Sequence, residues 1–238
     1  KLSQLPFVGA TANVVLANSI HKADLAEVER MLRPDGGVAV WVDPKFDLPD
    51  RYEIQSTNFG QTTKANSAQN AKYFVRSKLN GSGDWSHLYG RPDNSAFAGE
   101  QLGGAKVSDD LQVNWVGRPG PRYQADRSGR KPSPLSTAGR LFLQGLNRLV
   151  AVDAFNGTVL WALEIPDLGR FNMPRDSSNW CADRDFLYVV VKHECWKIAA
   201  ETGTVLQRMP VVSNKDGEFE WGYVGVSNQR LYGSDVKA

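Results

Sequence analysis

The clearest structural pattern of this chain lies in residues 139–161, which read GRLFLQGLNRLVAVDAFNGTVLW. Two short apolar runs, residues 141–143 and 149–152, are separated by a Gly-Leu-Asn turn, as in an antiparallel β-hairpin. Asn156 and Gly157 follow as a second turn, because both residue types tolerate the positive φ at which a chain reverses. The stretch therefore predicts three consecutive antiparallel strands.

The same pattern returns 46 residues later along the chain. Residues 185–207 read DFLYVVVKHECWKIAAETGTVLQ, so that Leu187 takes the place of Leu141 and Gly203 takes that of Gly157. A third copy begins at Gly222, where GYVGVSNQRLYG repeats the polar turn followed by Leu and Tyr. Self-similarity at a fixed period of this size predicts a repeated sheet unit.

Four residues of the first repeat form an Ala-x-Asp-x-x-x-Gly-x-x-x-Trp pattern, namely Ala151, Asp153, Gly157 and Trp161. This pattern resembles the pyrroloquinoline-quinone (PQQ) enzyme-like β-propeller repeat, whose blades share it as a docking motif. In the second repeat Gly203 is kept, whereas Lys197, Ala199 and Gln207 replace the Ala, the Asp and the Trp. The resemblance is to large, uncharacterised bacterial proteins, and it covers the later part of the chain.

The resemblance implies a mainly β fold, with a partial PQQ-like β-propeller of about three four-stranded blades in residues 84–238. Residues 84–97, DWSHLYGRPDNSAF, are similar to the segment that leads into the first blade of such propellers. Residues 111–115 are expected to form an outer strand, with Trp115 closing this blade as Trp161 closes the next.

Residues 1–43 have a different pattern, in which apolar strands at residues 13–17 and 38–42 flank a helix. Asp24 and Glu27 are placed as a capping box at the start of that helix. The order of strand, helix and strand predicts a parallel crossover. With its Leu-Arg-Pro-x-Gly-Gly turn, the segment resembles the C-terminal part of a class I S-adenosylmethionine (SAM)-dependent methyltransferase, a Rossmann-like α/β fold. The glycine-rich loop that holds the cofactor in that family would lie upstream of this segment.

Residues 44–83 are rich in Asn, Gln, Ser, Thr and Lys, and they predict a polar linker with one short strand near residues 73–76. A βαβ segment as short as residues 1–43 does not cover both faces of a parallel sheet. Two interpretations follow. Either the chain is a window cut from a longer protein, or residues 1–43 have decayed into a cap on the propeller.

The composition sets limits on function. The 238 residues carry a net charge of +2, and 23% of them are charged, as in an ordinary soluble globular protein. This charge is too small to predict nucleic-acid binding, and no apolar run reaches the roughly 20 residues that span a membrane. The family resemblance favours a periplasmic or other extracytoplasmic location, whereas a functional methyltransferase-like segment would favour the cytoplasm.

Few residues have the spacing of catalytic or metal-binding motifs. His21, His87 and His193 lie far apart, and the latter two are interpreted as turn residues rather than catalysts. Cys181 and Cys195 lack the CxxCH spacing of covalent haem attachment, and two buried thiols are the expectation.

Three functions are compatible with these patterns. The first is a binding or scaffold module that recognises a small anionic ligand or a protein partner without chemistry. The second, implied by the resemblance, is a quinoprotein dehydrogenase that oxidises an alcohol or sugar through PQQ and calcium, which only a complete propeller would hold. The third is a SAM-dependent methyltransferase with an appended propeller. Whether the chain is an enzyme stays open, and no cofactor is expected on these 238 residues alone.

The long polar connections between blades are the predicted ligand site. In an antiparallel blade these connections share one face with the turn between the second and third strands, while short turns lie on the opposite face. Loops longer than a turn requires are where binding usually resides, and arginine suits bidentate capture of a carboxylate or phosphate. The alternative is that these residues pair with acidic neighbours and fix the blade register. The residues are Arg118, Arg122, Arg170, Asn172, Arg175 and Asp176.

Overall fold

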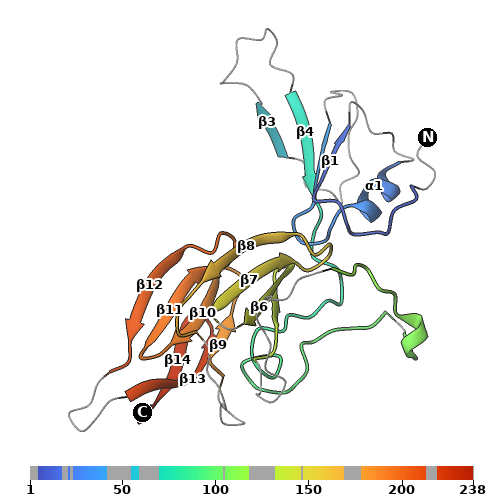
Figure 1. The fold of residues 1–238 in the computed structure, drawn as a ribbon. Helices are drawn as coiled ribbons and strands as arrows, with labels where there is room; N and C mark the ends of the chain where they lie inside the picture. The colour runs from blue at the N-terminus through green and yellow to red at the C-terminus, as the bar shows by residue number, and fades with distance from the viewer. Residues whose placement is uncertain are drawn as a thin grey trace. The chain divides into compact units, whose positions relative to one another are not determined.

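The structure is a computed structural model that describes residues 5–17, 21, 24–41, 55–58, 70–103, 105–117, 132–145, 147–168, 178–212 and 219–237. The chain divides into two compact units, which Figure 1 shows with their labelled elements. Unit 1 comprises Lys1–Asn80 and Leu111–Trp115, and unit 2 comprises Gly81–Asp110 and Val116–Ala238.

Unit 1 is a small mixed sheet with one helix. Strands β1 and β2 are parallel, as the strand, helix, strand pattern predicts, and β4 and β3 extend the sheet in the antiparallel sense to give the order β1-β2-β4-β3. The elements are β1 (Val14–Ala17), α1 (Leu25–Met31), β2 (Val38–Trp41), β3 (Gln55–Asn58) and β4 (Asn70–Val75).

Helix α1 packs its apolar residues on one face of this sheet. Leu25, Val28 and Leu32 share a core with Ala39 and Trp41 of β2. The apolar spacing along the helix is that of a single buried stripe, so burial of this stripe rather than intrinsic propensity holds a helix of seven residues in place.

The capping box predicted for α1 does not form. Asp24 is the N-cap residue, but its side chain makes no capping hydrogen bond. The Glu27 carboxylate instead accepts hydrogen bonds from the Leu5 backbone N–H at 2.6 Å and from Arg30 at 2.7 and 2.8 Å. These stronger charged contacts hold the pKa of Glu27 at about 2 and turn the carboxylate away from the N-cap.

Within the expected linker, residues 55–58 and 70–75 form strands of this sheet. The strand anticipated near residues 73–76 is β4, whose residues 72–75 pair with β2, and β3 pairs with β4. Phe74 is 1% exposed and its ring lies 6.1 Å from that of Trp41. A single buried aromatic residue thus anchors a segment whose polar composition argues for a linker.

Unit 2 consists of antiparallel sheets that resemble propeller blades, which confirms the mainly β fold. Each four-stranded sheet is a meander, and β6–β8 and β10–β12 are displaced by 46 residues, the period seen in the sequence. In Figure 1 these strands run from yellow to red. The first sheet contains β5 (Leu135–Thr137), β6 (Arg140–Gly145), β7 (Arg148–Asp153) and β8 (Val159–Glu164). The second contains β9 (Trp180–Ala182), β10 (Phe186–Val191), β11 (Glu194–Ala199) and β12 (Val205–Pro210), and a two-stranded sheet contains β13 (Phe219–Ser227) and β14 (Arg230–Lys237).

The repeat motif docks one sheet onto the next. Trp161 of β8 donates its indole N–H to the Ala200 carbonyl of the following sheet at 2.9 Å. A Cβ on Gly203 would lie 2.8 Å from the Trp161 ring, so glycine alone fits the contact, and its φ of +75° favours glycine as well. Gly203, the motif residue that the second repeat keeps, is therefore the residue that contacts the tryptophan of the preceding sheet.

Asp153 and Gly157 of the motif shape the turn that precedes β8. The Asp153 carboxylate accepts hydrogen bonds from the N–H groups of Phe155 and Asn156 at 2.9 and 3.2 Å, and Gly157 has a φ of +74°. This is an Asx-type turn, and it fixes the register in which β8, with Trp161, pairs with β7.

Apolar cores fill the spaces between these sheets. The larger one joins the two four-stranded sheets and includes Trp161 and Trp180. Cys181 and Cys195 lie in the core that joins the second sheet to β13 and β14, where both are free and buried, as expected from the sequence. Burial raises the pKa of Cys195 to about 12 and that of Cys181 well above its usual value, so both are thiols.

The outer strand expected at residues 111–115 is not present. Residues 111–117 are described but form no strand, and Leu111–Trp115 belongs to unit 1 rather than to a blade. Leu111 and Val113 are more than half exposed, so the alternation of apolar residues that suggests a strand has no sheet to bury against. Among the described residues of unit 2, helical structure is limited to the single 3₁₀ turn Ser108–Asp110.

Candidate ligand-binding pocket

A segment preceding the blades binds the first strands of successive sheets. Trp85 exchanges two backbone hydrogen bonds with Ser136 of β5, at 2.8 and 2.7 Å. The next carbonyl, that of Ser86, accepts a hydrogen bond from the Ala182 N–H of β9 at 2.9 Å. Residues 84–87 therefore lie against both four-stranded sheets at one end of their first strands.

His87 extends this attachment to β13. Its side chain is 1% exposed, and its Nε2 accepts a hydrogen bond from the Val226 N–H at 3.0 Å. Because Nε2 is the acceptor, Nδ1 carries the proton and donates to Ser86 Oγ at 2.8 Å. Burial lowers the pKa of His87 to about 4, so the imidazole is neutral. The residue is a buried bridge within a turn, in line with its interpretation as a turn residue.

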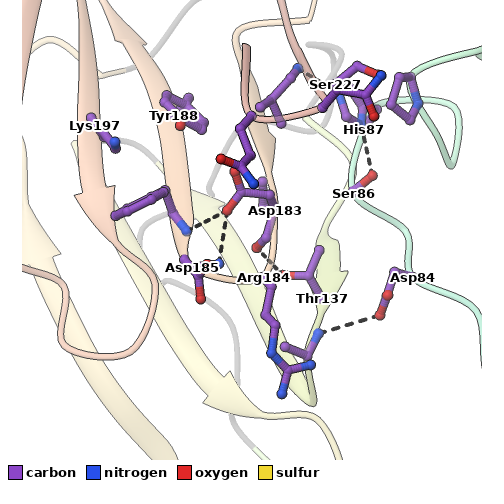
Figure 2. A pocket seen from close by; sticks show the side chains of 17 residues that line it. Asp84, Ser86, His87, Thr137, Asp183, Arg184, Asp185, Tyr188, Lys197 and Ser227 are labelled. Atoms are coloured by element: carbon purple, nitrogen blue, oxygen red, sulfur yellow. Dashed lines mark hydrogen bonds between the residues drawn. The ribbon is translucent and has the colours of Figure 1, made fainter. Parts of the chain in front are cut away.

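A pocket lies at the end of the sheets to which residues 84–87 bind. Its volume is about 630 Å³, and Figure 2 shows the side chains that line it. It is lined by the turns β5–β6, β9–β10 and β13–β14, by β10 and β11, and by the segment that carries Asp84 and His87. Three sheets and one connecting segment thus contribute to a single cavity.

The pocket wall combines an aromatic surface with a cation. Lys197 of β11 places its ammonium nitrogen 3.7 Å from the centre of the Phe186 ring, which is a cation–π contact. Tyr188 lies in the same wall and is 5% exposed. Burial, with smaller effects of Asp183 and the two cysteines, raises the pKa of Tyr188 to about 12, so its hydroxyl stays protonated.

A rigid turn presents carboxylates to the same cavity. The Asp183 Oδ1 accepts hydrogen bonds from the N–H groups of Asp185 and Phe186 at 2.9 and 2.7 Å, and Thr137 Oγ1 donates to the Asp183 carbonyl at 2.9 Å. Across the cavity, Asp84 accepts from the Ala138 N–H at 3.4 Å. Figure 2 shows Asp183 between the Lys197 wall and the segment with Ser86 and His87.

The charged residues of the lining carry both signs. Asp84, Asp183 and Asp185 contribute three carboxylates, and Arg184 and Lys197 contribute two cations. With a neutral His87, the lining has a net charge of about −1. The arrangement suits a polar ligand with an apolar part rather than a purely apolar one.

The six residues predicted as ligand contacts lie outside the described residues, so that prediction stays a prediction. The residues are Arg118, Arg122, Arg170, Asn172, Arg175 and Asp176. The pocket lies at the other end of the sheets, where the short turns are. The sequence contained one signal of it, since Lys197 is the charged residue that replaces the alanine of the repeat.

Two further findings concern the described residues only. None of their His, Cys, Asp and Glu side chains form a group of three or more that would hold a metal ion. Nor do these residues include a helix whose length and apolar character would let it cross a membrane.

No family model and no curated protein matches the chain. Among solved structures, the chain is similar to a quinohemoprotein alcohol dehydrogenase of Pseudomonas putida, with 17% identity, a TM-score of 0.35, and coverage of 46% of this chain and 17% of the other. A europium-containing methanol dehydrogenase gives 17% identity and a TM-score of 0.27, with coverage of 33% and 15%. BamB of Moraxella catarrhalis gives 12% identity and a TM-score of 0.34, with coverage of 47% and 36%.

The chain thus spans less than two fifths of each of these proteins. None of the three is a methyltransferase, and the resemblance of residues 1–43 to that class stays a prediction.

Proposed function

We propose that unit 2 is a ligand-binding module and that the pocket at the short turns is its binding site. The observation that carries this proposal is the convergence of three sheets and the segment 84–87 on one cavity. A cavity of about 630 Å³ is within the range of small-molecule sites, which run from about 300 to 1,000 Å³.

The backbone hydrogen bonds around the pocket support this function. Trp85 and Ser86 are bound to β5 and β9, His87 is bound to β13, and Asp183 is fixed by two N–H groups of its own turn. Groups held in this way lose little conformational freedom when a ligand binds, so the free energy of the contacts is retained as affinity.

PQQ with calcium does not fit this pocket. Calcium requires several oxygen ligands that converge on one point, and no three His, Cys, Asp or Glu side chains of the described residues are placed to hold a metal ion together, the three carboxylates of the lining included. We therefore assign no redox step to this pocket.

The function is tested with three probes that match the wall of the pocket, namely benzoate, benzylamine and phenol. Each is titrated into isotopically labelled protein, and amide chemical shifts are followed by NMR. We expect at least one probe to shift the amides of residues 183–186 and 226–229 more than those elsewhere.

A matched pair of variants controls for non-specific binding. Ser227 lines the pocket, so Ser227→Phe fills part of the cavity and should abolish the shifts. Gln207 is exposed on β12 and does not line the pocket, so Gln207→Phe should leave them intact. Shifts that persist in Ser227→Phe, or the lack of response to all three probes at millimolar concentration, would contradict the proposal.

A further inference from the structure

The pocket contains a lysine at the position where the repeat has a buried alanine. In the first sheet Ala151 is fully buried and lies opposite Trp161 in the register of β7 and β8. The equivalent pair in the second sheet is Lys197 opposite Gln207. The docking residues are thus replaced together, and the lysine that results is directed into the pocket instead of into a core.

Lys197 has an aromatic contact but no ion pair with any described residue. Its ammonium lies over the Phe186 ring, and no carboxylate of the described ranges lies within 4.0 Å of it. A half-buried ammonium that lacks an anionic partner can still bind an anion, and the contact with the Phe186 ring fixes the position of the Lys197 ammonium.

The carboxylate of Asp183 faces the same cavity from a turn that holds it in place. Its Oδ1 is used by two backbone N–H groups, which leaves Oδ2 as an acceptor for a ligand. A cation and an anion fixed on separate elements of one pocket match a ligand that itself carries both charges. The Phe186 ring, with the small exposed part of Tyr188, supplies apolar surface to the same pocket.

We propose that the pocket binds a free α-amino acid with an apolar or aromatic side chain. Its carboxylate pairs with Lys197, its ammonium pairs with Asp183, and its side chain lies along Phe186 and Tyr188. This inference rests on the proposed function and specifies the chemical class of its ligand.

The test compares three forms of one probe. Phenylalanine carries both charges, N-acetylphenylalanine lacks the ammonium, and phenylalanine methyl ester lacks the carboxylate. Affinities are measured by NMR titration at low ionic strength, where charge pairs are least screened. We expect phenylalanine to bind about tenfold more tightly than either blocked form, as the loss of one charge-assisted hydrogen bond predicts.

Two variants identify the residues that recognise the charges, and a third serves as their control. Lys197→Ala restores the residue of the repeat, and Asp183→Asn keeps an oxygen acceptor for the two N–H groups, so both should fold. Each should weaken phenylalanine binding about tenfold. Lys197→Ala should reduce the preference for phenylalanine over its methyl ester, and Asp183→Asn should reduce the preference for phenylalanine over N-acetylphenylalanine. Lys237→Ala, at the exposed far end of β14, should change neither.

The outcomes separate this inference from the proposed function. If phenylalanine fails to bind while benzoate, benzylamine or phenol still binds in the pocket, the amino-acid class is wrong and the binding function stands. Equal affinity for phenylalanine and its N-acetyl form would show that the ammonium is not recognised, and would overturn the inference. If no probe of either set binds, both proposals fall.

Discussion

At the scale of single residues, a few side chains and backbone angles determine how the blades begin. His87 joins the segment before the blades to β13 through a neutral imidazole. Ala138 and Gly139 form the β5–β6 turn with φ values of +47° and +71°, the signature of a type I′ hairpin. Ala138 is not a residue type that favours this conformation, and it therefore costs stability at the mouth of the pocket.

Replacing Ala138 by glycine should stabilise unit 2. Glycine removes the steric cost of a positive φ, which is about 1 kcal/mol. Glycine also adds conformational entropy to the unfolded chain, which costs about 0.5 kcal/mol, so the net gain in stability is about 0.5 kcal/mol. Urea unfolding should show a higher midpoint for Ala138→Gly. Ala182→Gly, in the strand β9, should lower the midpoint, since no strain is relieved there. A lower midpoint for both variants would mean that Ala138 is not strained.

The neutral state of His87 should make stability depend on pH. Its pKa is about 4 in the folded protein and about 6.5 in the unfolded chain, so the unfolded chain binds the proton first. The contribution is fully present above pH 6.5 and is lost as the pH falls towards 4, by up to about 3 kcal/mol at 1.36 kcal/mol per pKa unit.

His87→Gln provides the control for this pH dependence. The glutamine amide oxygen replaces Nε2 as acceptor for the Val226 N–H but does not titrate. Between pH 6.5 and 4, the free energy of unfolding should fall more steeply in the native protein than in the variant. Parallel curves would show that His87 is not the titrating group.

At the scale of elements, the contact between successive sheets is made by the repeat motif. Trp161 spans from β8 to the Ala200 carbonyl and lies on Gly203, and its ring is 6.0 Å from that of Phe142. The sequence predicts a docking motif from the spacing of Gly157 and Trp161, and of the motif residues only the glycine, as Gly203, recurs in the second repeat. It does not reveal that the tryptophan of one repeat meets the glycine of the next, since that contact depends on how the sheets stack.

Gly203→Ala should destabilise unit 2 by more than the strain of a positive φ. Its Cβ would lie 2.8 Å from the Trp161 ring, so the ring must move and its hydrogen bond to Ala200 would weaken. Gly103 is the matched control, because its φ of +61° is similar and a Cβ at that position would meet no atom within 4 Å.

We expect Gly103→Ala to cost about 0.5 to 1 kcal/mol and Gly203→Ala to cost about 2 to 4 kcal/mol in the free energy of unfolding. Calorimetry or urea unfolding measures both. In a Trp161→Ala background the difference between the two glycine variants should disappear. Equal losses in the native background would contradict the docking role of Gly203.

At the scale of the whole molecule, periodic patterns were predictable and individual long-range contacts were not. The 46-residue period predicts the strands β6–β8 and β10–β12, and the apolar spacing of residues 24–32 predicts the helix α1. The role of residues 70–75 depends on Phe74 meeting Trp41, and residues 111–115 have a strand-like alternation without a sheet to join. The pocket was missed because it is formed by short turns, whose convergence depends on the stacking of three sheets.

The two units should unfold as separate cooperative bodies. Their cores share no residues, since the core of unit 1 is made by α1, β2 and β4, and those of unit 2 lie between the blade-like sheets. Phe74→Ala removes a ring that is 1% exposed, which should cost about 3 to 5 kcal/mol. This loss should appear as faster hydrogen exchange of amides in β1, β2 and β4, with the amides of β6, β7, β10 and β11 unchanged.

Ile198→Ala, which opens the core of unit 2 at a fully buried position, should give the converse result. If Phe74→Ala instead accelerates exchange equally in both sets of strands, the chain behaves as one cooperative body, and the division into two units describes its geometry but not its energetics.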